Sequence, residues 1–101
     1  MSIFYVGDPI VQPTKITQLA FLDRFTDDEA VDIDLASVGA TREAALLRRY
    51  LQKVNAATHI DLSRPDLAED LQTLVSYGLL TAERRIVILT APVQEHEIFK
   101  G

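Results

Sequence analysis

The chain contains no cysteine and no tryptophan among its 101 residues, and it has only two histidines. The absence of cysteine excludes disulfide bridges, thiolate zinc sites and thiol nucleophiles. No apolar run approaches the roughly 20 residues that span a bilayer. Residues 1–5 also lack the basic start and the long apolar stretch of a signal peptide. We therefore expect no membrane partner and no secretion signal.

Basic residues are also scarce, because ten Lys and Arg face fifteen Asp and Glu and leave a net charge of −5. Proteins that bind a phosphate backbone usually carry a basic surplus or a basic stripe, so we expect no nucleic-acid partner. The one basic patch consists of Arg48, Arg49 and Lys53 around Tyr50. These side chains could meet phosphate, but we expect them to pair with the acidic segment before them, within the chain or across a subunit contact.

Catalytic and cofactor-binding patterns are missing as well. His59 and His96 have no Ser or Cys nucleophile at a recognisable spacing, and the isolated Gly7 and Gly39 form no phosphate-binding loop. The acidic run Asp27–Asp34 lacks the interleaved glycine turn and the late glutamate of a calcium loop. We therefore predict a protein that is not an enzyme, with no cofactor, no metal and no catalytic residue.

Apolar residues make up 48% of the chain, which is enough for one folded domain at this length. Apolar side chains recur at intervals of three and four, and this spacing is typical of helices. The predicted helices cover about residues 14–25, 26–38, 42–56, 64–77 and 82–89. The predicted N-caps are Thr26 in a capping box with Glu29, Thr41, Ser63 and Thr81. We predict a mainly α fold, a small bundle of about four to five short helices, with Gly78 ending one of them.

One segment allows two interpretations. Residues 31–35 alternate between apolar and acidic side chains, which could indicate a half-buried strand. Val31, Leu35 and Val38 also form a helical stripe, and the capping box at Thr26 favours the helix.

Both ends of the chain differ from the predicted helical domain, which covers residues 13–91. Residues 1–12 read as an extended arm or a short β-hairpin, and residues 92–101 follow a proline and read as an extended C-terminal arm. Large apolar side chains in such arms need cover, which a partner protein or the chain's own bundle could supply. The predicted partner-binding residues are Phe4, Tyr5, Ile10, Val11, Arg48, Arg49, Ile98 and Phe99.

Several runs of the sequence resemble a group of small, mostly uncharacterised proteins of tailed bacteriophages and prophages. The runs lie between residues 19 and 94: Leu19–Thr26, Glu29–Val31, Ile33–Ser37, Leu47–Thr58, Ile60–Leu62, Arg64–Asp66, Gly78–Leu80 and Ile88–Gln94. The group offers no catalytic motif to transfer. The resemblance implies a product of the late structural genes near the tail module.

These observations together predict a small virion structural protein of the tail, the baseplate or a fibre-attachment region. It would act through contacts with other phage structural proteins, in multiple copies, in the virion and before assembly in the host cytoplasm. The alternative is an acidic phage regulator or counter-defence protein that binds a basic host protein in the cytoplasm.

Overall fold

The structure is a computed structural model, and it describes residues 13–100. This part of the chain is mainly helical, as predicted. The helices are α1 (Gln18–Asp23), α2 (Asp27–Ala36), α3 (Arg42–Ala56), α4 (Pro65–Ser76) and α5 (Ala82–Thr90), joined by strands β2 (Lys15–Ile16) and β3 (Ile60–Asp61) and a 3₁₀ turn, η1 (Glu95–Glu97). The helix predicted over 42–56 has these bounds, and α2, α4 and α5 differ from their predictions by one or two residues at an end.

The helix starts depend on threonine caps. Thr26 accepts a hydrogen bond from the N–H of Glu29 while the Glu29 carboxylate accepts one from the N–H of Thr26, which forms the predicted capping box. Thr41 and Thr81 cap α3 and α5 by accepting hydrogen bonds from the N–H groups of Ala44 and Arg84, without a capping box. The predicted cap at Ser63 is wrong. The Ser63 hydroxyl donates to the Asp61 carboxylate, and α4 starts at Pro65 with Arg64 as its N-cap and no hydrogen bond from a capping side chain.

The first helix is shorter than the predicted 14–25. Lys15 and Ile16 form β2 instead and pair antiparallel with Asp61 and Ile60 of β3. Thr17 then caps α1 by accepting a hydrogen bond from the N–H of Ala20. Residues 15–16 are extended rather than helical because this conformation buries Ile16 fully, between Ile60 of β3 and Ile98 of the C-terminal segment.

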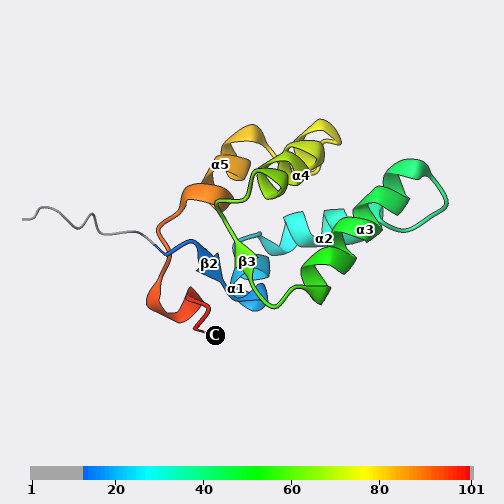
Figure 1. The fold of residues 1–101 in the computed structure, drawn as a ribbon. Helices are drawn as coiled ribbons and strands as arrows, with labels where there is room; N and C mark the ends of the chain where they lie inside the picture. Colours follow the sequence, from blue (N-terminus) through cyan, green and yellow to red (C-terminus); the bar gives the residue numbers. More distant parts are fainter. Residues whose placement is uncertain (1–12, 101) are drawn as a thin grey trace, which may run out of the picture.

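The helices form two pairs that diverge from the strand pair (Figure 1). α2 packs along α3, and α4 packs along α5, whereas α1 lies beside β2 where the two pairs meet. Gly78 lies just after the end of α4 at Ser76 and has a positive φ of 76°, as predicted. Glycine adopts this conformation at little cost. The buried apolar core is Ile16, Ala20, Phe21, Ile33, Ala44, Leu47, Ile60, Leu71, Leu74, Leu80 and Ile88.

The C-terminal segment, residues 92–100, lies on the rest of the chain, which is the alternative in which the arm is covered by the chain's own bundle. Glu97 is buried against Arg24, with the two Arg24–Glu97 hydrogen bonds each 3.0 Å long. Ile98 bridges to Ile16, and the N–H of Phe99 donates to the carbonyl of Lys15 at 3.0 Å. The segment returns because β2 offers it an unpaired edge and α1 offers it a buried cation.

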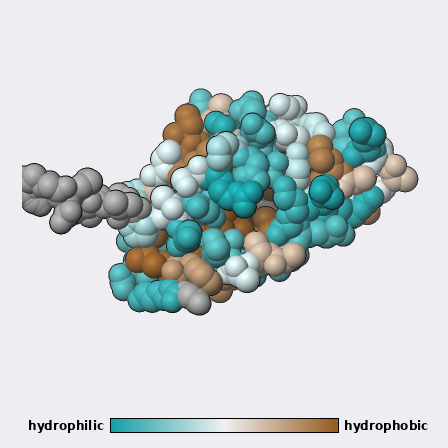
Figure 2. Space-filling model, in the orientation of Figure 1, coloured by the Kyte–Doolittle hydropathy of each residue, from teal (hydrophilic) through white to brown (hydrophobic). Residues whose placement is uncertain are grey.

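The outer surface mixes polar and apolar areas. Figure 2 shows hydrophilic side chains over most of one face, with smaller apolar areas between them. Among residues 13–100, no helix combines the length and the apolar character needed to cross a bilayer.

Candidate functional site

The two arginines predicted to bind a partner have different environments. Arg48 donates from Nη1 to the carbonyl oxygens of Ser37 at 2.7 Å and Gly39 at 2.6 Å, just beyond the end of α2. Among the described residues it therefore contacts backbone carbonyls after α2 and forms no ion pair with the acidic run Asp27–Asp34. Arg49 is exposed and makes no hydrogen bond or ion pair within the described part of the chain.

The predicted C-terminal contact residues are partly covered by the chain itself. Ile98 and Phe99 are half-buried, and the Phe99 ring lies 4.9 Å from the ring of His59, centroid to centroid. The chain itself therefore covers these two side chains in part, as in the alternative in which the C-terminal arm folds back on its own bundle. The remaining predicted contact residues, Phe4, Tyr5, Ile10 and Val11, lie outside the described residues.

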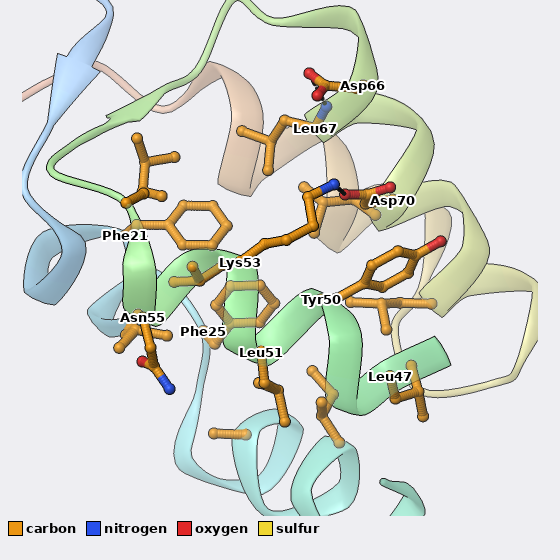
Figure 3. A pocket seen from close by; sticks show the side chains of 18 of the residues that line it. Phe21, Phe25, Leu47, Tyr50, Leu51, Lys53, Asn55, Asp66, Leu67 and Asp70 are labelled. Carbon is orange, nitrogen blue, oxygen red and sulfur yellow. Dashed lines mark hydrogen bonds and ion pairs between the residues drawn. The ribbon is translucent and has the colours of Figure 1, made fainter. Parts of the chain in front are cut away.

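An apolar groove with a volume of about 490 Å³ lies between α3 and α4. We call it the α3/α4 groove. Figure 3 shows its floor and walls, with Phe21 and Phe25 of the α1 region beneath the apolar side chains of the two helices. The two phenylalanine rings meet edge to face, with centroids 5.4 Å apart.

The spacing of apolar residues explains the two walls. On α3 the wall consists of Leu47, Tyr50, Leu51 and Val54, and on α4 it consists of Leu67, Leu71 and Leu74. Residues three or four positions apart share one face of a helix, so each helix turns a continuous apolar face toward the other. Leu47, Leu71 and Leu74 are buried, whereas their wall neighbours are only half-buried. The two helices thus leave apolar surface uncovered between them.

Charged side chains border this groove. Lys53 of α3 reaches over to Asp70 of α4, with Nζ 3.5 Å from Oδ2 and 5.8 Å from the Tyr50 ring centroid (Figure 3). Arg64 and Asp66 form a second pair at 2.9 Å, and the hydrogen bond from the guanidinium lowers the pKa of Asp66. Both signs of charge are therefore present at the rim of an apolar interior.

This arrangement suits the burial of apolar side chains from another molecule. Burial of a recessed apolar surface by a ligand is favourable because it removes that surface from water. A few polar groups at the edge then fix the orientation of the ligand. Within residues 13–100, no three His, Asp or Glu side chains lie close enough together to hold a metal ion.

Sequence reasoning did not find the α3/α4 groove. It assigned the apolar faces of residues 42–56 and 64–77 to the core, and periodicity identifies such faces without telling how closely two of them approach. The signal that could have raised the question is the pair of apolar faces on consecutive predicted helices, because the sequence shows that both faces need cover but not whether each fully covers the other.

Comparison of the chain with protein-family models, with curated proteins and with solved structures finds no match.

Proposed function

We propose that this protein is a small structural component of a tailed-phage virion and that it binds a neighbouring virion protein through the α3/α4 groove. The observation that carries the proposal is the groove itself, an apolar hollow of about 490 Å³ with ion pairs at its rim. A protein that acts by such contacts needs no catalytic group.

The groove favours an amphipathic helix of the neighbour as its occupant. Its two walls are helices, and a third helix laid between them would complete a bundle by inserting apolar side chains at intervals of three and four. The rim carries both signs of charge, so it complements a helix whose apolar face has acidic and basic borders. Two or three large apolar side chains would occupy the available volume.

The phage assignment is supported by the sequence resemblance, since its runs include the α3 wall of the groove and one ion pair at the rim. Leu47–Thr58 covers most of α3, and Arg64–Asp66 covers the start of α4 with one of the rim ion pairs. A late structural protein would reside in the virion, and in the host cytoplasm before assembly, in multiple copies beside other phage structural proteins.

Two variants that each replace an alanine by tryptophan test whether the groove is the docking site. Ala30 is exposed and lines the groove, so Ala30→Trp fills it from the side without disturbing a buried contact. Ala45 is exposed on α3 and does not line it, which makes Ala45→Trp the matched control. Because the natural chain has no tryptophan, both variants also carry a fluorescent reporter of their surroundings.

The measurement is peptide mass spectrometry of gradient-purified phage particles, with the abundance of this chain scaled to a known tail protein. We expect the natural chain and Ala45→Trp at one fixed ratio and Ala30→Trp at least about tenfold depleted. Absence of the natural chain from particles would overturn the virion assignment. Equal incorporation of both variants would overturn the groove as the docking site. Binding of a small apolar dye without any effect on incorporation would point to a small-molecule occupant instead.

The second candidate is an acidic regulator or counter-defence protein, and the exposed aspartates of α2 favour it. Asp27, Asp28, Asp32 and Asp34 all lie on the surface of one helix. A basic host enzyme could bind such a surface. Co-purification from infected cells separates the two candidates, because the first predicts particle proteins and the second predicts one basic host protein.

A further inference from the structure

Helix α2 has an exposed apolar stripe as well as a buried face. Val31 and Leu35 on α2 are 54% and 67% exposed, and Val38, which follows in the turn after the helix ends at Ala36, is 76% exposed. Val31 and Leu35 are four residues apart and so lie on one side of α2, and Val38 extends this apolar stripe into the turn beyond the helix. We call this stripe the α2 seam. Large apolar residues gathered in this way mark an interaction surface more often than single exposed ones do.

The opposite side of the same helix already contacts the core. Ile33 and Ser37 are buried, and Ala36 is half-buried. Since successive helical residues are separated by about 100°, the α2 seam cannot reach this core while Ile33 stays in place. Nothing among residues 13–100 covers the seam, so cover has to come from outside this part of the chain.

Aspartates border the α2 seam on both sides. Asp28 and Asp32 lie on one border and Asp34 on the other, with Asp27 near the N-terminal end of the seam, as the helical angles require. All four are exposed, and none forms an ion pair with a described residue. The remaining acid of the helix, Glu29, is occupied by Arg84 on the core side.

We propose that the α2 seam binds an amphipathic helix of a partner protein whose apolar face is bordered by lysine and arginine. Apolar residues at a four-three spacing pack best against a helix with the complementary spacing. Aspartates on both borders select basic borders on the partner, because opposite charges steer the encounter and fix the register. This surface is separate from the α3/α4 groove, and the inference does not depend on the proposed function.

Charge also argues against a second copy of this chain as the occupant. In a two-fold symmetric contact the same patch meets itself, so the aspartates of one α2 would lie beside those of the other. Such like-charge contacts are destabilising. A foreign basic helix avoids this repulsion.

A designed peptide tests the proposal with the full chain. The probe is a synthetic helical peptide with leucine at a four-three spacing and lysine on both borders, and the comparison peptide carries glutamate in place of lysine. Fluorescence anisotropy of the labelled peptides measures their affinity, and chemical shift changes in amide NMR spectra locate the contact. We expect the lysine peptide to bind on α2, to weaken with added salt, and to bind at least about tenfold more tightly than the glutamate peptide.

Matched variants separate the α2 seam from general attraction to an acidic protein. Leu35→Ala removes an exposed seam residue and should weaken binding about tenfold, whereas Ile86→Ala on α5, also exposed, should leave it unchanged. Neutralising Asp28 and Asp32 to asparagine should weaken binding more than neutralising Glu43 and Glu83 to glutamine, which removes the same charge elsewhere.

Three results would overturn the proposal. The first is the absence of saturable binding by the lysine peptide, and the second is equal loss in the Leu35→Ala and Ile86→Ala variants. The third is self-association of the natural chain that Leu35→Ala abolishes, which would assign the α2 seam to a second copy.

Discussion

At the scale of single residues, Arg24 connects three segments that are distant in the sequence. Its Nε and Nη2 atoms donate to the Glu97 carboxylate, and Nη1 donates to the carbonyl oxygens of Ile88 at 2.9 Å and Ala91 at 3.0 Å. The side chains of Arg24 and Glu97 are only 7% and 10% exposed. A buried ion pair of this kind is costly to break from one side, because the remaining charge loses its partner.

We therefore expect Glu97→Gln to lower the free energy of unfolding by roughly 2 kcal/mol, the range measured for hydrogen bonds to charged groups. Glu95→Gln is the matched control, because the Glu95 side chain is 83% exposed and pairs with Lys100 at the surface. This substitution should lower the free energy of unfolding by less than about 0.5 kcal/mol. Urea unfolding of both variants measures the difference. Equal losses would show that the Arg24 contact contributes no more than a surface pair.

The half-buried contact between Arg84 and Glu29 predicts a pH dependence. The hydrogen bond from Arg84 is the largest influence on Glu29 and lowers its pKa below 4.5, against the opposing effect of burial. A carboxylate with a lower pKa in the folded state stabilises the fold fully above its unfolded pKa, and this contribution is lost as the pH falls through the folded value. Glu29→Gln keeps an acceptor for the capping box but removes the charge.

The natural chain should accordingly be more stable than Glu29→Gln at neutral pH, and the difference should shrink as the pH falls below the ordinary pKa of a glutamate and through the lowered pKa of Glu29. Chemical unfolding at several pH values gives the two curves. A difference that stays constant over this range would mean that the charge on Glu29 has no part in the contact with Arg84.

At the scale of elements, Arg48 completes the connection between α2 and α3. The last carbonyl groups of a helix lack partners within it, and Arg48 supplies donors to the carbonyls of Ser37 and Gly39. The neighbouring Arg49 supplies none to the described residues. These two adjacent arginines therefore form a matched pair for measurement.

Arg48→Met should lower the free energy of unfolding by about 1 kcal/mol, because it keeps the aliphatic stem and removes the donors. Arg49→Met removes the same charge and should change stability by less than about 0.5 kcal/mol. Thermal unfolding followed by circular dichroism compares them. If the arginine at position 49 proved the more costly to replace, the assignment of Arg48 to the end of α2 would be wrong.

The elements also show what sequence alone could predict. Thr26, Thr41 and Thr81 identify their helix starts because a cap depends on residues within one turn. β2 could not be predicted, because two residues are too few to show a periodicity and because Ile60, which pairs with Ile16, lies far along the chain. The stripe of Val31, Leu35 and Val38 was recognised as helical, but periodicity cannot say that Ile33 occupies the core in its place. The candidate site was missed for the same reason, since it depends on how two correctly predicted helices approach each other.

At the scale of the whole molecule, two helix pairs diverge from one small junction (Figure 1). The α3/α4 groove lies between a helix of one pair and a helix of the other. The junction consists of β2, β3, α1 and the C-terminal segment. Gln18 strengthens it by donating from Nε2 to the carbonyl oxygens of Val54 and Ala57 at the end of α3. The C-terminal segment is thus part of the fold that holds the groove in shape.

A chain that ends at Gln94 tests this role. It loses the Glu97 carboxylate, the bridge between Ile16 and Ile98, and the Phe99 ring against His59. Because about 1 kcal/mol shifts the unfolding midpoint of a domain this size by several degrees, we expect the midpoint to fall by at least about 10 °C.

The matched control is a chain that ends at Phe99, which keeps all three of these contacts and loses only the exposed pair of Lys100. Its midpoint should stay within about 2 °C of that of the natural chain, because an isolated surface ion pair contributes little. Differential scanning calorimetry gives both values. If the chain ending at Gln94 kept its midpoint, the C-terminal segment would be dispensable for the fold, and Ile98 and Phe99 would again be available to a partner.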